Sequence, residues 1–449
     1  MKSIYAICIV FIFIYNVIFP NFSYVMVDAL KGTAIDENTL LEGGWIKELP
    51  GVLLLHTEGS YYKMGYQHGY LLKERIQRNI LIYFNFYESK GTTYNDFHAI
   101  WNATKPYVPD QIIEEMQGIA DGSGIPFETI AVSNIVPMKY HCALFSAYGP
   151  ATSSGDLYFT RSLDYTYIKD PVTGEEWDTQ MMIIREPEEG FVSMYPGFTG
   201  FAYCYGGINE KGISIAHATS YCNDETYNGT HLRFRMKEVL DHASTVQEAV
   251  QIMNANKTCG YNIIIADGKT NENVLIEQNA NISYVGTWNQ SDEANHPCWP
   301  IDHVIRRTNF YVNKTLAASQ RPCFDPRNPI NYLKILENIR SEEFRGLPSQ
   351  FWFHYKALSQ EIEKRWGFIN LSDAMDLIRD VYNGKNNIMF KINDIQWNII
   401  HFGYYSIHQW VACPKTGDML ISFATSDISA FKQPVMYFNL FELKAYVPP

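Results

Sequence analysis

Short apolar runs separated by turn formers dominate the chain after residue 140. Their length and their content of β-branched residues predict strands, and the stretch 157–165 alternates apolar and polar positions as a half-buried strand does. The predicted strands are 142–149, 157–165, 179–185, 191–195, 201–205, 212–218, 261–267, 273–278 and 282–286. The last three follow one another so closely that they predict a meander.

Helical spacing of apolar residues lies before and after these strands. It predicts helices over 61–82, 109–121, 231–243, 245–254, 329–340, 352–364 and 372–382, with final strands after the last of them. Gly122 and Gly124 are typical of a helix C-terminus, and Thr245 with Glu248 forms a capping box. Strands gathered between blocks of helices favour an α+β fold with two layered sheets and helices outside.

One predicted hairpin brings a cysteine, an arginine and an aspartate together. Its two strands flank the turn-forming sequence ATSSGD. Pairing about Ser153 or Ser154 predicts that Asp164 faces Cys142 across the ladder, with Arg161 near both. A nearby guanidinium lowers the pKa of a thiol, so the arrangement predicts a nucleophile. A buried cysteine beside a surface ion pair is the alternative interpretation of this spacing.

The Cys142 thiol has no obvious histidine base in this stretch. A cut between His141 and Cys142 would free an α-amine with an ordinary pKa of about 7.7 to 8.0, within one residue of the thiol. Asp164 could then hold the amine, and Arg161 could contact both the thiolate and the aspartate. The sequence therefore predicts a self-cleaving nucleophile that supplies its own base.

The motif C-x-x-x-x-A-x-G-x-A-T-x-x-G-x-L-x-x-x-R-x-L-D-Y begins at Cys142. It resembles the isopenicillin N acyltransferase-like (acyl-coenzyme A:6-aminopenicillanic acid acyltransferase) family of self-cleaving N-terminal nucleophile hydrolases and, more distantly, choloylglycine hydrolases, penicillin V acylase and acid ceramidase. The resemblance implies a four-layer αββα sandwich, with catalytic roles for Cys142, Arg161 and Asp164. Similar stretches extend it over most of residues 45–445, at 59–69, 114–130, 206–216 and 406–424.

The chain departs from the family's pattern at the residue before the predicted nucleophile, where His141 stands in place of a common glycine. This difference is expected to affect the rate of self-cleavage more than its occurrence. The relatives also carry a later asparagine that serves the oxyanion or the substrate amide. Asn295 is its best match because Arg306 and the next arginine follow it, and Asn289 is the competitor. Arg306 is itself a candidate contact for the substrate or the oxyanion. Losing an amide donor to an oxyanion costs about 3 to 4 kcal/mol of barrier. An ordinary Asx turn is the alternative for either asparagine.

Met1 and Lys2 are followed by an apolar run over 3–19, which predicts a signal peptide or membrane anchor within 1–28. A buried N-terminal helix is the alternative. An extracytoplasmic location, whether secreted, lysosome-like or membrane-anchored, would make glycosylation possible at the seven N-glycosylation sequons beyond residue 28. These are at Asn102, Asn228, Asn256, Asn281, Asn289, Asn313 and Asn370. The cut would divide the remainder into a mainly helical chain, 29–141, and a catalytic chain, 142–449, held together.

Cysteine count and charge agree with such an enzyme. Apart from Cys8 and Cys142, six cysteines remain, enough for three disulfide bridges in an oxidising compartment, with free buried thiols as the alternative. No metal-binding spacing is present, and neither a metal nor a cofactor is expected. The excess of 48 acidic over 36 basic residues, a net charge of −12, disfavours nucleic acid as a partner.

These observations predict an amidohydrolase that cleaves a non-peptide or peptide-like N-acyl amide of a small molecule through a thioester on Cys142. An acyltransferase that uses acyl-CoA and an amine is the alternative with the same site. A catalytically silent secreted glycoprotein that binds a partner is the alternative from another class. Hydrolysis is favoured because acyl-CoA is scarce outside the cytoplasm, and association with a membrane is expected only through the N-terminal segment.

Overall fold

The computed structural model describes residues 37–135, 141–165, 167–178, 180–327, 349–382 and 405–446. The chain divides into two compact units, Met1–Leu40 and Leu41–Pro449. In the first unit the structure describes only residues 37–40, which form the start of helix α2 (Glu37–Leu41). The predicted N-terminal segment 1–28 and the predicted helix 329–340 lie outside the described residues.

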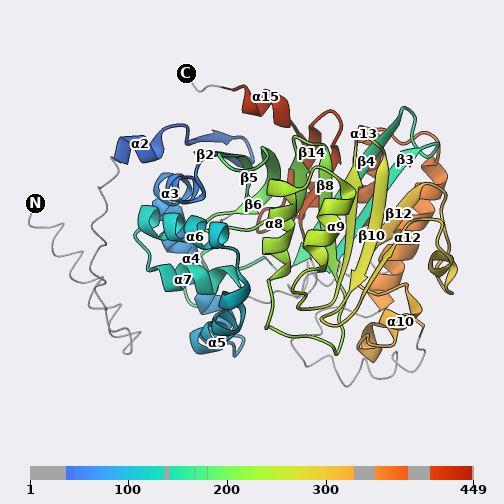
Figure 1. Ribbon diagram of the computed structural model, residues 1–449, viewed down its shortest axis with the longest axis horizontal. Coiled ribbons are helices and arrows are strands. Elements are labelled where there is room, and N and C mark those ends of the chain that lie inside the picture. Colours follow the sequence, from blue (N-terminus) through green and yellow to red (C-terminus); the bar gives the residue numbers. More distant parts are fainter. Residues whose placement is uncertain are drawn as a thin grey trace, which may run out of the picture. The chain divides into compact units, whose positions relative to one another are not determined.

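Nine strands of the second unit form one sheet (Figure 1). Neighbouring strands are antiparallel except β2 and β5, which pair in parallel because the intervening chain forms helices and a hairpin of the other sheet. In order across the sheet the strands are β1 (Trp45–Leu49), β2 (Val52–Gly59), β5 (Gln180–Pro187), β6 (Ser193–Phe198), β7 (Gly206–Asn209), β8 (Ile213–Thr219), β9 (Tyr261–Asp267), β10 (Glu272–Gln278) and β11 (Ser283–Gly286).

The second sheet has six antiparallel strands and carries the predicted nucleophile. Its β3 and β4 form the hairpin, and β13 and β14 form the predicted closing hairpin. In order across the sheet the strands are β12 (Val304–Arg307), β3 (His141–Gly149), β4 (Gly155–Tyr165), β13 (Tyr405–Cys413), β14 (Asp418–Phe423) and β15 (Met436–Asn439).

Helices cover the outer faces of both sheets. β3 and β4 face β8 across the interior, α8 and α9 pack on the far side of the first sheet, and α12 and α13 pack on the far side of the second. The predicted αββα sandwich is therefore confirmed. The helices are α3 (Tyr61–Leu71), α4 (Lys73–Glu88), α5 (Tyr94–Thr104), α6 (Asp110–Ser123), α7 (Phe127–Asn134), α8 (Leu232–His242), α9 (Val246–Asn254), α10 (Lys314–Ala317), α12 (Ser349–Arg365), α13 (Leu371–Tyr382) and α15 (Leu440–Lys444).

Helices α3 and α6 touch through glycines, and this contact corrects one prediction. A Cβ on Gly65 would lie 2.1 Å from the backbone oxygen of Glu115, and Gly118 and Gly122 are equally tight against α3. Gly122 is thus an interior glycine that permits close packing, and it does not end α6. Gly124 ends it, in the left-handed conformation with φ +73°.

Two predicted elements differ in the structure. The predicted helix 61–82 is divided between α3 and α4 at Leu72. The predicted strand 201–205 has no strand geometry. Its aromatic residues are buried by packing on one another, with the rings of Phe201 and Tyr203 5.0 Å apart and those of Tyr203 and Tyr205 5.3 Å apart. A buried loop and a buried strand can have the same apolar composition, so the sequence could not distinguish a loop from a strand at 201–205.

The predicted disulfide bridges are wrong for four of the six remaining cysteines. These four thiols are free and buried, where cysteine packs as a small apolar side chain. They are Cys204, Cys222, Cys298 and Cys413, while the side chain of Cys323 lies outside the described residues.

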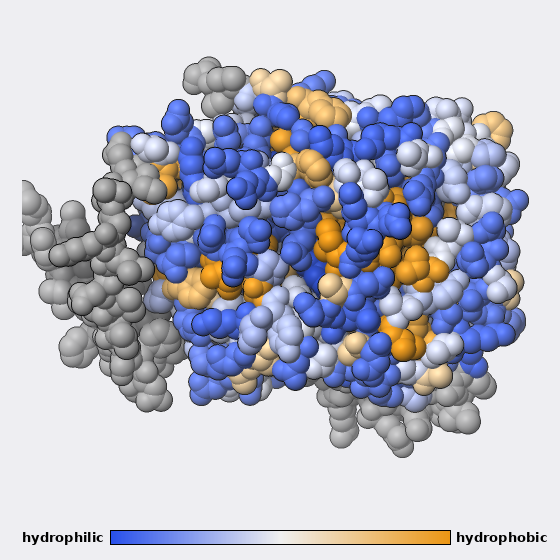
Figure 2. Space-filling model, in the orientation of Figure 1, coloured by the Kyte–Doolittle hydropathy of each residue, from blue (hydrophilic) through white to orange (hydrophobic). Residues whose placement is uncertain are grey.

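The surface is mainly hydrophilic on the face shown in Figure 2, with apolar residues in separate small groups. Along the described parts of the chain, no helix combines the length and the apolar character needed to cross a membrane.

Candidate active site

The β3–β4 hairpin brings the predicted residues together in a register one position from the expected one. Asp164 lies opposite His141, and the prediction that it faces Cys142 is wrong. The reason is the turn, which is centred earlier than expected because the last pair of the ladder joins Gly149 to Gly155. Cys142 and Asp164 therefore point to opposite faces of the sheet, since side chains directly opposite one another share a face.

Alternation along β4 also separates Arg161 from Asp164, because residues three apart on a strand point to opposite faces. Cys142 belongs to the core between the two sheets, and Arg161 shares this face, with its Nη2 3.4 Å from the Cys142 Sγ. Arg161 was predicted to contact both the thiol and the Asp164 carboxyl. Among the described contacts, it reaches only the thiol.

Arg161 is fully buried, which removes the alternative of a surface ion pair. Its Nε donates to the carbonyl of His217 at 3.2 Å and its Nη1 to His408 Nε2 at 3.4 Å, while the guanidinium lies 5.5 Å from the centre of the Tyr205 ring. Within the described ranges no carboxylate pairs with this guanidinium. Its positive charge therefore faces the thiol without a neutralising anion.

The surroundings of the Cys142 thiol oppose its ionisation. Burial raises its pKa to about 11, although the Arg161 guanidinium acts in the opposite direction. The side chain is fully buried, and the backbone N–H of Asp164 contributes a hydrogen bond to the sulfur. At neutral pH the sulfur is therefore a protonated thiol.

Asn309 is the asparagine that contacts the nucleophile, and the sequence did not predict it. The backbone N–H of Cys142 donates to Asn309 Oδ1 at 2.9 Å, and Asn309 Nδ2 donates to the carbonyl of Thr219 at 2.7 Å. This buried side chain holds the nitrogen that a cut before Cys142 would convert to an amine. In the sequence it lies two residues after Arg307, a position that the local pattern does not distinguish.

The two asparagines that were predicted have other partners. Asn295 is half-buried, and its Nδ2 donates to Asp292 Oδ1 at 2.9 Å and to the carbonyl of Val312 at 3.1 Å. Asn289 is exposed, and its Oδ1 accepts a hydrogen bond from the Thr287 hydroxyl at 2.6 Å. The described contacts bring neither of them to Cys142.

Arg307 anchors the segment that carries Asn309. Its guanidinium pairs with Glu277 at 2.8 Å and with Glu293, and all three side chains are buried. Glu277 in turn accepts a hydrogen bond from the backbone N–H of Asn313 at 2.9 Å. The ion cluster thereby fixes the chain on both sides of the asparagine.

Arg306 points the other way, toward α12. Its Nε donates to the Ser359 hydroxyl at 2.5 Å and its Nη2 to the carbonyl of Trp299 at 2.6 Å, with the guanidinium 4.7 Å from the centre of the Tyr355 ring. Arg306 is fully buried and pairs in the ladder with Phe145, which faces the α12–α13 layer. The structure therefore places this predicted substrate contact on the face opposite the thiol.

Asp164 and His141 lie on the face toward α12 and α13. Burial raises the pKa of Asp164 to about 7, while hydrogen bonds from Tyr382 and Ser162 act against it. Burial holds the pKa of His141 well below its ordinary value, and its ring lies edge-on to Phe351 at 4.4 Å. A neutral, enclosed His141 agrees with a site whose base is not a histidine.

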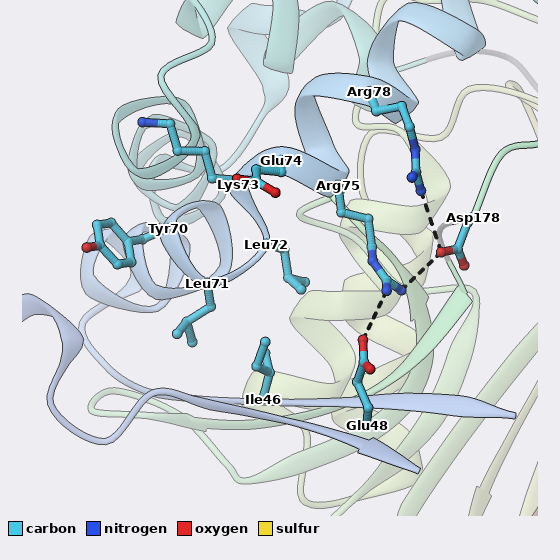
Figure 3. A pocket seen from close by; sticks show the side chains of 10 residues that line it. All are labelled: Ile46, Glu48, Tyr70, Leu71, Leu72, Lys73, Glu74, Arg75, Arg78 and Asp178. Atoms are coloured by element: carbon cyan, nitrogen blue, oxygen red, sulfur yellow. Dashed lines mark hydrogen bonds and ion pairs between the residues drawn. The ribbon is translucent and has the colours of Figure 1, made fainter. Parts of the chain in front are cut away.

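One surface cleft lies away from Cys142. This cleft of about 750 Å³ is formed by α4 and β1, where Arg75 bridges Glu48 and Asp178, each at 3.2 Å, and Arg78 lies 3.6 Å from Asp178 (Figure 3). Cys142 is not among its lining residues. The described residues also contain no group of three histidine, cysteine, aspartate or glutamate side chains placed to hold a metal ion.

Residues 157–327 match the model of the family described as acyl-coenzyme A:6-aminopenicillanic acid acyl-transferase. The predicted resemblance to this family is confirmed. The matched segment contains Arg161 and Asn309, which contact Cys142, and also Asp164. It begins after Cys142, so the match covers residues around the thiol and does not include the thiol itself.

Two individual relatives are 25% and 28% identical to the chain over the aligned residues. The chain is 25% identical over 304 residues to protein dcd1B of Dictyostelium discoideum, covering 61% of this chain and 59% of that protein. It is 28% identical over 236 residues to protein dcd1A of the same organism, covering 49% and 52%. The chain thus spans between half and three fifths of the length of these curated relatives. In structure, a mutant conjugated bile acid hydrolase from Clostridium perfringens aligns with a TM-score of 0.38 and 11% identity, over 67% of this chain and 93% of that one.

Proposed function

We propose that this chain is a self-cleaving cysteine amidohydrolase of the N-terminal nucleophile type, acting on a small-molecule N-acyl amide. The observation that carries the proposal is the setting of Cys142, whose thiol lies 3.4 Å from an unneutralised Arg161 and whose N–H is held by Asn309. Similarity of the surrounding segment to a family of acyl-transferases supports chemistry on an acyl group.

Self-cleavage would begin with attack of the Cys142 sulfur on the carbonyl carbon of His141. The carbon–nitrogen bond of that peptide breaks, a thioester forms, and the thiol proton ends on the nitrogen, which becomes the α-amine of Cys142. Water then hydrolyses the thioester, giving a carboxylate on His141 and restoring the thiol. Because the thiol pKa is about 11 before the cut, this first step is expected to be slow.

The mature site would gain a base that the uncut chain lacks. The new α-amine, with an ordinary pKa of about 7.7 to 8.0, can take the thiol proton at neutral pH and later deliver it to the leaving amine. Asn309 Oδ1, which already accepts from this nitrogen, would orient the amine, and Arg161 would stabilise the thiolate. Asn309 Nδ2 donates to the carbonyl of Thr219, and backbone N–H groups would stabilise the oxyanion.

The two products of the cut are proposed to stay bound. β2 of the first chain pairs along its length with β5 of the second. Glu115 of the first chain forms buried ion pairs with Arg185, at 2.9 Å, and with Lys237. A shared sheet and a desolvated ion cluster are features of a permanent interface.

Acyl transfer to an amine is the second candidate, because the matched family is described as an acyl-transferase. The same thioester would then be formed from acyl-CoA and resolved by an amine in place of water. A silent binding protein with this fold is the outcome if neither reaction is found.

The decisive experiment is intact-mass and N-terminal analysis of the purified protein, followed by assays on N-acyl amides. We expect a chain that begins with Cys142, and release of free acid in water alone. Cys142→Ala should remain uncut and inactive, and a thiol alkylator should block the mature protein. An uncut protein that is fully active would refute the mechanism. Product formed only with acyl-CoA and an amine would favour the transferase.

An extracytoplasmic location remains a proposal that rests on the apolar N-terminal segment and the sequons. Six of the seven sequon asparagines are exposed. Asn313 is the exception, because it is buried and its Oδ1 caps α10 by accepting from Leu316 N–H at 3.1 Å. After expression through a secretory pathway, glycosidase treatment and peptide mapping should find glycans on exposed sites and none on Asn313. A protein without any glycan would contradict the proposed location.

A further inference from the structure

Among the described residues, the Asp164 carboxyl is held by two hydroxyl groups and by no cation. The Tyr382 hydroxyl donates to Oδ2 at 2.5 Å, and the Ser162 hydroxyl donates to Oδ1 at 2.7 Å. The side chain is 1% exposed, and no lysine, arginine or histidine of the described chain forms an ion pair with it. Both carboxyl oxygens therefore have a fixed direction.

Each donor is itself held by a second element. Ser162 shares a hydrogen bond with the Ser406 hydroxyl at 3.1 Å and accepts one from Gln409 Nε2 at 3.2 Å, both on β13. Tyr382 is the last residue of α13, and its ring packs against that of His354 on α12 at 5.2 Å. The carboxyl is thus positioned between a strand and two helices.

This arrangement lies beside the peptide that the proposed function requires to be cut. Asp164 is directly opposite His141 in the ladder, so both side chains occupy the same face, and Cys142 is the next residue. A carboxyl fixed at this place can accept a hydrogen bond from the amine that the cut creates at Cys142. Its direction toward that amine depends on the two hydroxyl groups that hold it.

We propose that Tyr382 is a positioning residue for this reaction, which orients the Asp164 carboxyl toward the amine of Cys142 through its phenol hydrogen bond. The proposal rests on the proposed function. It adds a residue 218 positions away in the chain, on a helix that packs against the far side of the catalytic sheet.

A pH dependence follows from this geometry. The groups that face the Asp164 side are Tyr382, Ser162 and His354, with His141 opposite and the charge of Arg161 on the other face of the same strand. Burial, the largest influence, raises the pKa of Asp164 to about 7, and the phenol acts against burial because it stabilises the charged carboxylate. Tyr382→Phe removes that donor, so the pKa of Asp164 should rise further.

The first test uses the uncut Cys142→Ala chain and needs no enzymatic activity. Because the pKa of Asp164 is higher in the folded than in the unfolded state, stability falls as pH rises from about 4 toward 7. Adding Tyr382→Phe should extend this fall above pH 7. The loss of Tm caused by Tyr382→Phe should therefore grow between pH 6 and pH 8. A loss of Tm that is the same at every pH would show that Tyr382 only packs, and would overturn the proposal.

The second test uses the mature enzyme. Tyr382→Phe should lower kcat with little change in KM, and it should move the acid limb of the pH–rate profile upward by about 1 pH unit, the size expected for one hydrogen bond to a charged group. Tyr83→Phe is the matched control, since it removes a buried hydroxyl that donates to the carbonyl of Ser133 at 3.4 Å and lies in the helical layer. An unmoved acid limb in Tyr382→Phe would overturn the proposal.

The two tests separate the proposal from the proposed function. If the wild-type chain neither cuts itself nor hydrolyses an amide, the proposed function fails. The pH-dependent loss of Tm still decides whether Tyr382 supports the Asp164 carboxylate. Ser162→Ala removes the other donor to Asp164. It should also make the loss of Tm grow with pH and move the acid limb of the pH–rate profile upward. Shifts in the opposite direction would contradict the inference that these hydrogen bonds stabilise the Asp164 carboxylate.

Discussion

Two arginines are buried to the same degree in this molecule, yet they have different surroundings. Arg185 is 1% exposed and pairs with Glu115 at 2.9 Å and Asp241 at 2.5 Å. Arg161 is 0% exposed and contacts a thiol, a carbonyl and an imidazole. The comparison indicates that Arg185 maintains the fold, while Arg161 retains a charge that can act on a reacting group.

The energetic difference between the two sites follows from burial. Although burial opposes it, the carboxylates of Asp241 and Glu115 raise the pKa of Arg185 well above its ordinary value. A buried charge without such partners is costly unless a counter-charge appears. At Arg161 the thiolate of Cys142 would supply that counter-charge during the reaction. The buried Arg161 charge thus lowers the stability of the fold, and it would stabilise the thiolate of Cys142.

Arg185→Met should have the largest effect, because it leaves Glu115 and Asp241 buried without their main partner. Breaking a buried ion pair in this way costs about 3 to 5 kcal/mol. Urea denaturation of the uncut Cys142→Ala chain with and without Arg185→Met would measure the loss. A loss below about 1 kcal/mol would show that the cluster is not needed for the fold.

Arg161→Met should leave the fold intact and impair the chemistry. We expect turnover to fall by about 10² to 10³-fold, the range found when one stabilising donor of a reacting group is removed. Because the variant removes an unneutralised buried charge, its Tm should be unchanged or higher. Near-normal turnover, or a loss of stability as large as that of Arg185→Met, would remove the distinction between the two arginines.

Asn309→Ala should reduce turnover by about 10²-fold, since positioned proton transfer contributes at least this much. Asn295→Ala is the matched control, because its amide is engaged with Asp292 and Val312, and turnover should change by less than about threefold. Steady-state rates of the two purified variants, compared at equal folded fraction, decide the assignment. If Asn295→Ala shows the larger loss of turnover, Asn295, the asparagine predicted from the sequence, is the one that serves the reaction.

Arg75→Met should have the smallest effect, although Arg75 also bridges two carboxylates (Figure 3). Glu48 and Asp178 are largely exposed there, and such pairs contribute about 0 to 1 kcal/mol. The same urea assay provides the comparison with Arg185→Met. An equally large loss would mean that burial does not separate structural from incidental ion pairs here.

The sequence predicted the layers of the fold and the hairpin, but not its register. Alternation and capping residues predict elements locally, and the Thr245 capping box is present as expected. Register depends on where a turn is centred, which several small polar residues allow equally. The same uncertainty explains why Asp164 was expected on the face of Cys142.

Tyr382 and Asn309 could not be found from local spacing. Each is brought to the hairpin by a distant element, α13 for Tyr382 and the segment after β12 for Asn309. The contact of Arg161 with Asp164, by contrast, could have been rejected from sequence, because positions three apart on a strand cannot share a face. Arg306 was predicted to contact the substrate, but its partner Ser359 lies on a helix whose position only the fold determines.

The parallel pairing of β2 with β5 has a consequence for the lifetime of this protein. In the uncut chain the two strands belong to one polypeptide and meet at a rate set by loop closure. After the proposed cut they would belong to two, and recovery from complete denaturation would become a second-order process that slows on dilution and competes with aggregation. The mature molecule should therefore show hysteresis, with refolding yields that depend on concentration, whereas the Cys142→Ala chain should refold independently of it.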